Sequence, residues 1–365
     1  MIGNACPQPI EDAVCAVRES ARSSSTSDLH IEPNAPPWSR VDGDLQPMAA
    51  REIDSDTIRS FCEAYLGKRE SERLSGPHGS ADGAIQHPRL GSIRIHAFRS
   101  DRGIGLSLRL LRSEVPTLST LRLPPIVSAF ADYPHGLVLF TGPTGSGKST
   151  ALAGLIDEIN ERHSRHIVTV EDPIEYRHHN KRSLIRQREI GRDVGSYNES
   201  VRGLLRADPD VISIGELRDA DVMSACLQAG ETGHLVFSTL HTAEAAETVQ
   251  RIVGSFDGSR QEQVRMQLAQ SLQAIVSLRL VADSSGIGRH AACEILINNA
   301  AVRSQLCAPE RLLHIRNTIE VSRKDGMQTL EMDLSRLVRE GLITLEAAIA
   351  ASDYPDQIKS PSSVR

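Results

Sequence analysis

The segment that most constrains the fold is residues 140–150, which read FTGPTGSGKST. It satisfies the phosphate-loop pattern G-x-x-x-x-G-K-[ST], and it lies between an apolar run and a helical segment, where that pattern functions. Glycines allow the backbone to curl so that N–H groups face the phosphates, and the helix N-terminus adds partial positive charge. The pattern therefore predicts a nucleoside triphosphate site, and the rest of the chain must indicate its use.

The predicted nucleotide-binding residues are those of the loop and the start of the helix. Lys148 is expected to reach the β- and γ-phosphates of ATP, and Ser149 to offer its hydroxyl to Mg²⁺. The predicted set is Gly142, Pro143, Thr144, Gly145, Ser146, Gly147, Lys148, Ser149 and Thr150. ATP and Mg²⁺ are thus the expected cofactors.

Length and composition bound the possible functions. At 365 residues the chain is too long for one ordinary core, and it suggests two domains. Its net charge of −6 provides no global basic field, and an aromatic content of 3% leaves few platforms for base stacking. A nucleic-acid partner is therefore not expected.

The location of the protein also follows from composition. No apolar run approaches the roughly 18–20 residues needed to cross a bilayer. The first twenty residues lack the basic start and apolar block of a secretory signal, and the six cysteines are scattered without a C-x-x-C pair. We expect a cytoplasmic protein that meets a membrane only through partners.

The pattern of elements changes near Gly136. From there on, short apolar strands alternate with helical segments, which predicts an α/β domain with a mainly parallel sheet. Val264, Leu268, Leu272 and the pair at 275–276 are expected to form one stripe of a long helix. Further helices are expected up to about residue 351.

Residues 92–111 alternate twice around a polar turn, which predicts an antiparallel hairpin. With the turn centred on residues 101–102, Arg94 lies opposite Arg109. Two like charges facing each other destabilise a hairpin unless an anion lies between them, and a γ-phosphate is a natural candidate. The alternative is that both side chains point into water, or that the register is shifted.

Acidic residues follow two of the expected parallel strands. The second strand ends in VEDPIE, with Glu171, Asp172 and Glu175, and carboxylates there suit water or metal handling. Asp172 alternatively caps a turn before Pro173. After the third strand, VISI, Gly215 stands where a generic phosphate-loop ATPase places an aspartate. Glu216 then supplies the carboxylate, and contact with Mg²⁺ through water is expected.

The fourth strand is bounded by histidines. His241 is expected at the carboxyl end, beside the acids, as a sensor of the γ-phosphate, with a purely structural role as the alternative. His234 is expected at the opposite end, in coupling or at an interface. This separation, without a nearby cysteine, argues against a zinc site.

Four segments in order, GPTGSGKST, VTVEDPIEY, LRADPDVISIGELRD and ETGHLVFSTLHT, resemble the Walker A, Asp, Walker B and His boxes of the type II/type IV secretion ATPases. The PilT branch is the nearest likeness. The resemblance covers roughly residues 26–350, including SDLHIEPNAPPWSRVDGDL, IRIHAFRSDRG and GMQTL. It implies a RecA-like P-loop ATPase domain preceded by a smaller α+β PAS-like domain.

The resemblance also implies domain boundaries and roles. The expected organisation is a flexible lead-in at 1–25, the PAS-like domain at 26–112, a linker at 113–125, and the ATPase domain with C-terminal helices and a frayed tail at 126–365. It assigns Glu175 as general base and Glu216 as the magnesium-ordering acid. Arg94 and Arg109 match arginines that reach the nucleotide across domains or subunits.

As a function, the resemblance implies a hexameric motor at the cytoplasmic face of the inner membrane. Its ATP-driven domain motions would power a type IV pilus, by PilT-like retraction, or a related secretion machine through an inner-membrane platform protein. Residues 301–308 depart from an AIRNLIRE-like helix of retraction motors. A nucleotide-gated docking subunit with weak hydrolysis, or an assembly-type ATPase, is the alternative.

Overall fold

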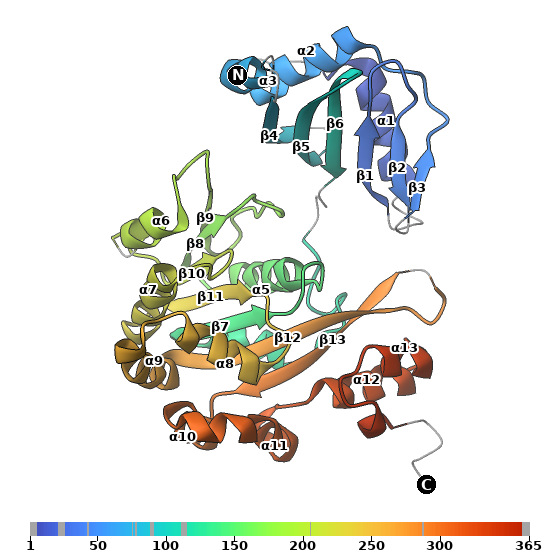
Figure 1. Cartoon of the computed structure of the whole chain (residues 1–365). Coiled ribbons are helices and arrows are strands. Elements are labelled where there is room, and N and C mark those ends of the chain that lie inside the picture. Colours follow the sequence, from blue (N-terminus) through green and yellow to red (C-terminus); the bar gives the residue numbers. More distant parts are fainter. Residues whose placement is uncertain are drawn as a thin grey trace. The chain divides into compact units, whose positions relative to one another are not determined.

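The computed structural model describes residues 6–20, 26–41, 44–74, 76, 79–87, 91–110, 115–204, 206–286 and 288–359. The chain divides into two compact units, residues 1–114 and 115–365. Each unit is built around its own β-sheet (Figure 1). Within the described residues, no helix combines the length and the apolar character needed to span a membrane.

The first unit contains a six-stranded sheet in the order β3-β2-β1-β6-β5-β4, and every neighbouring pair is antiparallel. The strands are β1 (Thr26–Ile31), β2 (Trp38–Val41), β3 (Asp44–Pro47), β4 (Ser80–His87), β5 (Gly91–Ser100) and β6 (Gly103–Leu110). The helices are α1 (Gln8–Ser20), α2 (Ser55–Leu66) and α3 (Lys68–Leu74). The α+β character expected for this region is confirmed.

The β5–β6 hairpin has the register predicted from its sequence. Ser100 pairs with Gly103, and Arg94 pairs with Arg109. Alternate residues, among them Ile93 and Leu108, are fully buried and pack in one cluster with side chains of α1 and α2. The sheet therefore has one apolar face in the core, and the arginines lie on its other face.

Helix α1 corrects the expected lead-in at 1–25. Ile10, Val14 and Val17 recur at helical spacing, and all three are fully buried in the core of the first unit. Residues 8–20 are therefore a docked helix, because burial of this apolar stripe stabilises a segment too short to be helical alone. Residues 1–5 and 21–25 lie outside the described residues.

The expected linker at 113–125 is also corrected. Leu118 and Leu123 are buried in a cluster of the second unit, together with side chains of α5 (Lys148–Arg162). Gly154 of α5 permits this approach, because a β-carbon there would lie 2.8 Å from the carbonyl oxygen of Pro116. The prolines suggested an extended connection, but the leucines between them anchor this segment to the second unit.

The second unit contains a seven-stranded sheet in the order β13-β12-β7-β11-β10-β8-β9. All neighbours are parallel except β12 and β13. The strands are β7 (Gly136–Thr141), β8 (His166–Glu171), β9 (Leu184–Glu189), β10 (Val211–Ile214), β11 (Leu235–Leu240), β12 (Leu272–Ala282) and β13 (Arg289–Ile297). The mainly parallel α/β sheet expected here is confirmed.

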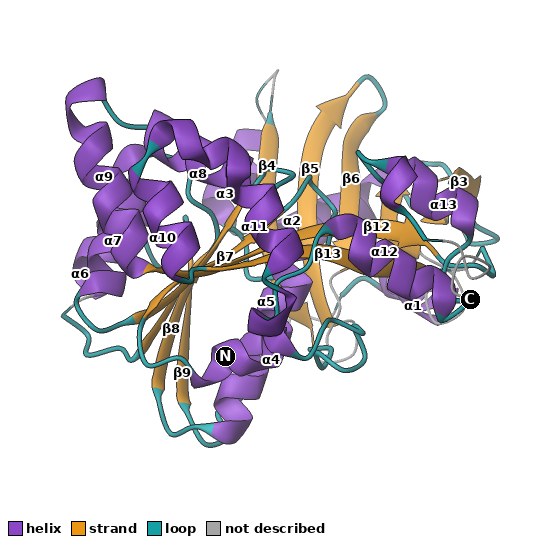
Figure 2. Cartoon of the chain, turned by 90° about the horizontal axis from the view of Figure 1, so that it is seen from below, coloured by secondary structure: helices purple, strands orange, loops and turns teal. Residues whose placement is uncertain are grey.

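Helices cover both faces of this sheet (Figure 2). Leu137 and Leu139 of β7 pack in a cluster with α6–α11, whereas Val138 and Phe140 pack in another with α4 and α5. The helices besides α5 are α4 (Ile126–Ala129), α6 (Tyr197–Leu204), α7 (Ala220–Glu231), α8 (Ala245–Gly254), α9 (Gly258–Ser271), α10 (Ala300–Cys307), α11 (Ile315–Val321), α12 (Leu330–Arg339) and α13 (Leu345–Ala350).

The long helix predicted through residues 264–276 is wrong in its second half. Helix α9 ends at Ser271, and Leu272 begins β12, which pairs with both β7 and β13. The run of apolar residues fits a helical stripe and a strand buried on both faces equally well, so spacing alone does not distinguish them. The predicted C-terminal helices are present up to α13, and the expected frayed tail at 360–365 lies outside the described residues.

Candidate nucleotide and catalytic site

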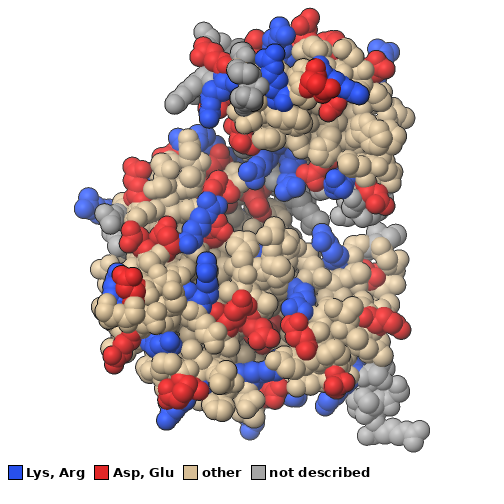
Figure 3. Space-filling model, viewed as in Figure 1, with Lys and Arg blue, Asp and Glu red and all other residues tan. Residues whose placement is uncertain are grey.

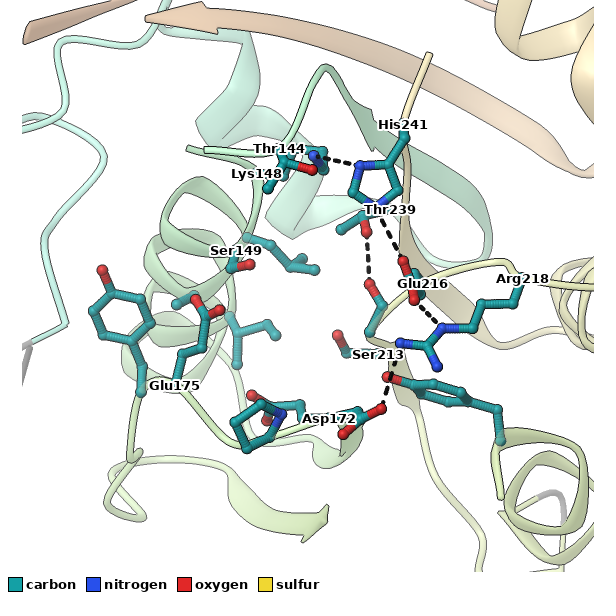
Figure 4. Close-up of a pocket in the computed structure, with 18 of the residues that line it drawn as sticks. Thr144, Lys148, Ser149, Asp172, Glu175, Ser213, Glu216, Arg218, Thr239 and His241 are labelled. Atoms are coloured by element: carbon teal, nitrogen blue, oxygen red, sulfur yellow. Dashed lines mark hydrogen bonds and ion pairs between the residues drawn. The ribbon is translucent and has the colours of Figure 1, made fainter. Parts of the chain in front are cut away.

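A cavity of about 390 Å³ opens at the carboxyl ends of the parallel strands of the second unit. It collects the phosphate loop, the acids that follow β8 and β10, and the histidine that follows β11 (Figure 4). The predicted residues that line it are Thr144, Gly145, Lys148, Ser149, Glu175, Glu216 and His241. Segments far apart in the sequence therefore meet where a parallel sheet ordinarily binds its ligand.

The phosphate loop has the backbone that its glycines permit. Gly142, Gly145 and Gly147 have φ values of 137°, 79° and 96°. At Gly142 a β-carbon would also lie 2.5 Å from the Ser146 hydroxyl oxygen, so a larger residue would collide within the loop. Gly147 precedes α5 and provides no side-chain cap for its first N–H groups, and the buried hydroxyl of Ser146 has no hydrogen-bond partner. The N–H groups at this helix end and the Ser146 hydroxyl can donate to an anion.

Lys148 is folded back over the loop. Its Nζ donates to the carbonyl oxygens of Gly142 and Pro143 at 2.7 and 2.9 Å, and it lies 3.5 Å from Nδ1 of His241. Burial lowers the pKa of its amine, which the carboxylates of Glu216 and Glu175 partly offset. The ammonium thus stands within the loop, close to where a phosphate would enter.

Two other residues of the predicted set have contacts outside the loop. Thr150 Oγ1 lies 3.0 Å from the Tyr176 hydroxyl, which ties the first turn of α5 to the segment after β8. Ser149 lines the cavity, and its side chain is drawn on the same side as Glu175 (Figure 4). The Ser149 hydroxyl is therefore available to a cation, whereas the Thr150 hydroxyl is engaged in structure.

Glu216 is held by two side chains, those of His241 and Arg218. One carboxylate oxygen lies 3.0 Å from Nε2 of His241, and the other accepts a hydrogen bond from Nε of Arg218. Burial alone would raise the pKa of Glu216, but these two partners lower it below its ordinary value. Thr239 fixes the backbone here, because its hydroxyl donates to the Gly215 carbonyl at 2.7 Å. Glu216 is thus an ionised carboxylate at a fixed position.

The three acids after β8 are placed differently. Glu171 accepts hydrogen bonds from the Thr169 hydroxyl at 2.6 Å and from Gln187 at 3.0 Å, and burial raises its pKa. Asp172 lies 3.4 Å from a guanidinium nitrogen of Arg218. All three acids line the cavity, and Glu175 is half-buried. Because Glu171 and Asp172 are held by the partners named above, Glu175 is the best placed of the three to act on a ligand.

The two histidines lie at opposite ends of β11, as predicted. His241 bridges Lys148 and Glu216, so both a sensor role and a structural role remain compatible with its contacts. His234 Nδ1 lies 3.2 Å from the Ala229 carbonyl oxygen, outside the cavity. Among the described residues, no group of three or more His, Cys, Asp or Glu side chains is arranged to hold a metal ion.

Arg218 and Tyr197 also line the cavity, although no role was predicted for either residue. Arg218 lies over the Tyr197 ring, 5.6 Å from its centroid. The Tyr197 hydroxyl would lie 2.6 Å from a β-carbon at position 215, so Gly215 makes room for it. Arg218 is two residues after Glu216 in the GELRD segment. This short separation in sequence could have indicated that Arg218 belongs to the site.

Arg94 and Arg109 belong to the first unit, and the cross-strand pairing predicted for them is confirmed. The anion that lies beside Arg109 is a carboxylate. Nε of Arg109 donates to Oδ1 of Asp28 at 2.8 Å, and Asp28 on β1 is a cross-strand partner of Arg109. A carboxylate of the same sheet therefore compensates this charge. The hairpin alone gives no reason to invoke a phosphate.

Comparison with known proteins now decides the family. A family model described as "Type II/IV secretion system protein" matches residues 5–340. This chain belongs to that family. The resemblance on which the sequence analysis relied is therefore confirmed over nearly the whole chain.

Relatives of the PilT branch match at high coverage. The type IV pilus retraction ATPase PilT of Pseudomonas aeruginosa is 38% identical over 90% of this chain and 95% of its own. The twitching motility protein of Neisseria gonorrhoeae is 41% identical over 86% and 83%. The crystal structure of the pilus retraction motor PilT with bound ADP superimposes with a TM-score of 0.84 over 94% of this chain and 98% of that one, at 38% identity.

Proposed function

We propose that this protein hydrolyses ATP and acts as a ring-forming motor of a type IV pilus, by PilT-like retraction, or of a related secretion machine. The observation that carries the proposal is the convergence of Lys148, Ser149, Glu175, Glu216 and His241 around one cavity. The similarity to a retraction motor solved with ADP supports nucleotide as the ligand. The acids supply what hydrolysis needs in addition to binding.

Within this proposal, each residue has a chemical role. Lys148 would leave the loop carbonyls to pair with the β- and γ-phosphates, and Ser149 and Glu216 are the residues that would hold Mg²⁺. Mg²⁺ would stabilise the charge that develops on the phosphates. Glu175 accepts a proton from the attacking water as general base. His241 reports the γ-phosphate to the element that follows β11.

The assembly is proposed to be a homohexamer at the cytoplasmic face of the inner membrane, docked on a platform protein. Arg94 and Arg109 would complete the site from another domain or subunit, a contribution that typically accelerates hydrolysis by about 10³–10⁵-fold. On the face drawn in Figure 3, acidic and basic side chains are intermingled. No nucleic-acid partner is proposed.

Coverage favours the retraction branch over the assembly and secretion branch. A type II secretion protein E of Aeromonas hydrophila is 40% identical, but over only 52% of this chain and 37% of its own. The PilU relative of Pseudomonas aeruginosa, at 34% identity, matches 91% and 87%. The domain organisation thus supports a retraction-type motor, with an assembly-type ATPase as the alternative.

The decisive experiment measures phosphate release by the purified protein and by Lys148→Ala, with native mass determined with and without ATP. We expect hydrolysis that is lost in the variant, and a sixfold mass. The Arg162→Gln variant is a matched control, because Arg162 pairs with Asp132 outside the cavity. Wild-type protein that binds ATP without turnover would instead support a nucleotide-gated docking subunit.

A further inference from the structure

The guanidinium of Arg218 bridges the two acidic loops of the cavity. Its Nε donates to Glu216 after β10, and its Nη2 lies 3.4 Å from a carboxylate oxygen of Asp172 after β8. Strands β8 and β10 are parallel neighbours, so both carboxylates lie at the same edge of the sheet. One side chain therefore compensates two acids that would otherwise repel each other.

A second observation concerns where the guanidinium rests. It lies 5.6 Å from the centroid of Tyr197, a buried side chain of α6, whereas the Arg218 side chain is itself 56% exposed. A guanidinium over an aromatic face is attracted by the ring. The guanidinium of Arg218 therefore contacts the Tyr197 ring on one side and stays open to solvent, so it can leave Glu216 without disrupting the core.

The carboxylates that hold Arg218, those of Glu216 and Asp172, are also the kind of ligand that a divalent cation binds. Mg²⁺ takes oxygen ligands and commonly uses one or two carboxylates together with substrate phosphates. Glu216 already has one oxygen on His241 and the other on Arg218. A hydrated cation ordered by Glu216 needs at least one of these oxygens. His241 and Arg218 are similarly exposed, at 52% and 56%, but of the two it is Arg218 that also holds Asp172, so its release frees both carboxylates for the cation.

We propose that Arg218 is a placeholder for the magnesium ion, neutralising Glu216 and Asp172 until the metal–nucleotide complex displaces it. The inference rests on the proposed function and deepens it, since it concerns how the same site accepts its metal. Arg218 is a positioning residue here, because it acts through the two carboxylates. Its displacement from Glu216 would couple metal entry to the segment between β10 and α7.

The proposal predicts a specific linkage between metal and nucleotide. In the wild type, Arg218 screens the acids when Mg²⁺ is absent, so metal-free nucleotide still binds. In Arg218→Gln the uncompensated acids repel metal-free nucleotide and attract the metal more strongly. The ratio of the ADP dissociation constants without and with Mg²⁺ should therefore rise, by about tenfold for a change of roughly 1.4 kcal/mol.

The test titrates a fluorescent ADP analogue into wild type and Arg218→Gln, once in EDTA and once in saturating MgCl₂. A parallel titration of Mn²⁺ followed by electron paramagnetic resonance, in the presence of ADP, should show metal binding about tenfold tighter in the variant. Arg218→Lys, which keeps a cation, should give an intermediate ratio. Arg162→Gln should leave the ratio unchanged.

Two outcomes overturn the placeholder role. An unchanged ratio, with both constants weakened in parallel and a lower melting temperature, would mean that Arg218 only stabilises the fold. A smaller ratio would mean that Arg218 contacts the phosphates directly. Because the readout is binding, failed hydrolysis alone does not affect the test, whereas wild-type protein that binds no ADP would refute the proposed function as well.

Discussion

The two sheets of this molecule use opposite designs. In β5, Ile93 and Ile95 are fully buried whereas Arg94 and His96, which alternate with them, are exposed, so the first unit has one buried and one polar face. In β7 and β11, all six positions are buried, because helices cover both faces. Polar side chains are therefore presented from a sheet face in the first unit, and from strand ends in the second.

The largest expected effect concerns the strand ends. Replacing Glu216 with Gln keeps the size of the side chain but removes the charge that orders Mg²⁺, so turnover should fall by at least about 10²-fold. Nucleotide binding should persist, since Lys148 and the loop are unchanged. Phosphate release together with ADP titration checks this. Near-normal turnover would refute the assignment of Glu216.

The packing contrast is tested by one truncation in each sheet. Phe237 in β11 is fully buried, and its replacement by Ala should cost about 3–5 kcal/mol of unfolding free energy. His96→Ala, on the polar face of the first unit, should change it by less than about 0.5 kcal/mol. Urea denaturation measures both. Similar costs would mean that the two sheets are not packed differently.

A buried acid makes the stability of the second unit depend on pH. Burial raises the pKa of Glu294 in β13 to about 7, although a hydrogen bond from the Ala245 backbone lowers it. Glu244, Arg316 and Glu331 also act on it. The folded state therefore holds this proton more tightly than the unfolded state does, and its stabilising contribution is complete below about pH 4.5 and lost as the pH rises through about 7.

In Glu294→Gln this contribution cannot vary with pH. The unfolding free energy of the wild type, measured relative to the variant, should therefore fall by up to a few kcal/mol between pH 5 and pH 8. Its melting temperature should fall with it. Thermal unfolding of both proteins at the two pH values checks the sign. A difference that is constant, or that grows with pH, would contradict a neutral buried Glu294.

Only a small effect on the unfolding free energy is expected from a change on the polar face of the first unit. Asp28 pairs with Arg109, whose side chain is 60% exposed, so Asp28→Asn should cost about 1 kcal/mol or less. Salt should reduce the difference between the two proteins, because the pair is partly solvated. Denaturation at low and high ionic strength measures it. A cost that is large and independent of salt would show that the face is less exposed than described.

Sequence patterns with a short period were enough for much of this molecule. The phosphate loop, the register that sets Arg94 opposite Arg109, and the parallel α/β sheet were all predicted and are confirmed. Each depends on spacing within a few residues, or on an alternation that only one element satisfies. The convergence of Lys148, Glu175, Glu216 and His241 also followed, because parallel strands bring their carboxyl ends to one edge.

Tertiary structure alone decided what depends on burial and on partners distant in sequence. Residues 8–20 form a helix because their apolar stripe finds a core, and residues 272–282 form a strand because β7 and β13 flank them. Arg218 acquires Asp172 as a partner only because β8 and β10 lie side by side. Local spacing limits which structure a segment can adopt, but its free energy depends on neighbours that the chain supplies from elsewhere.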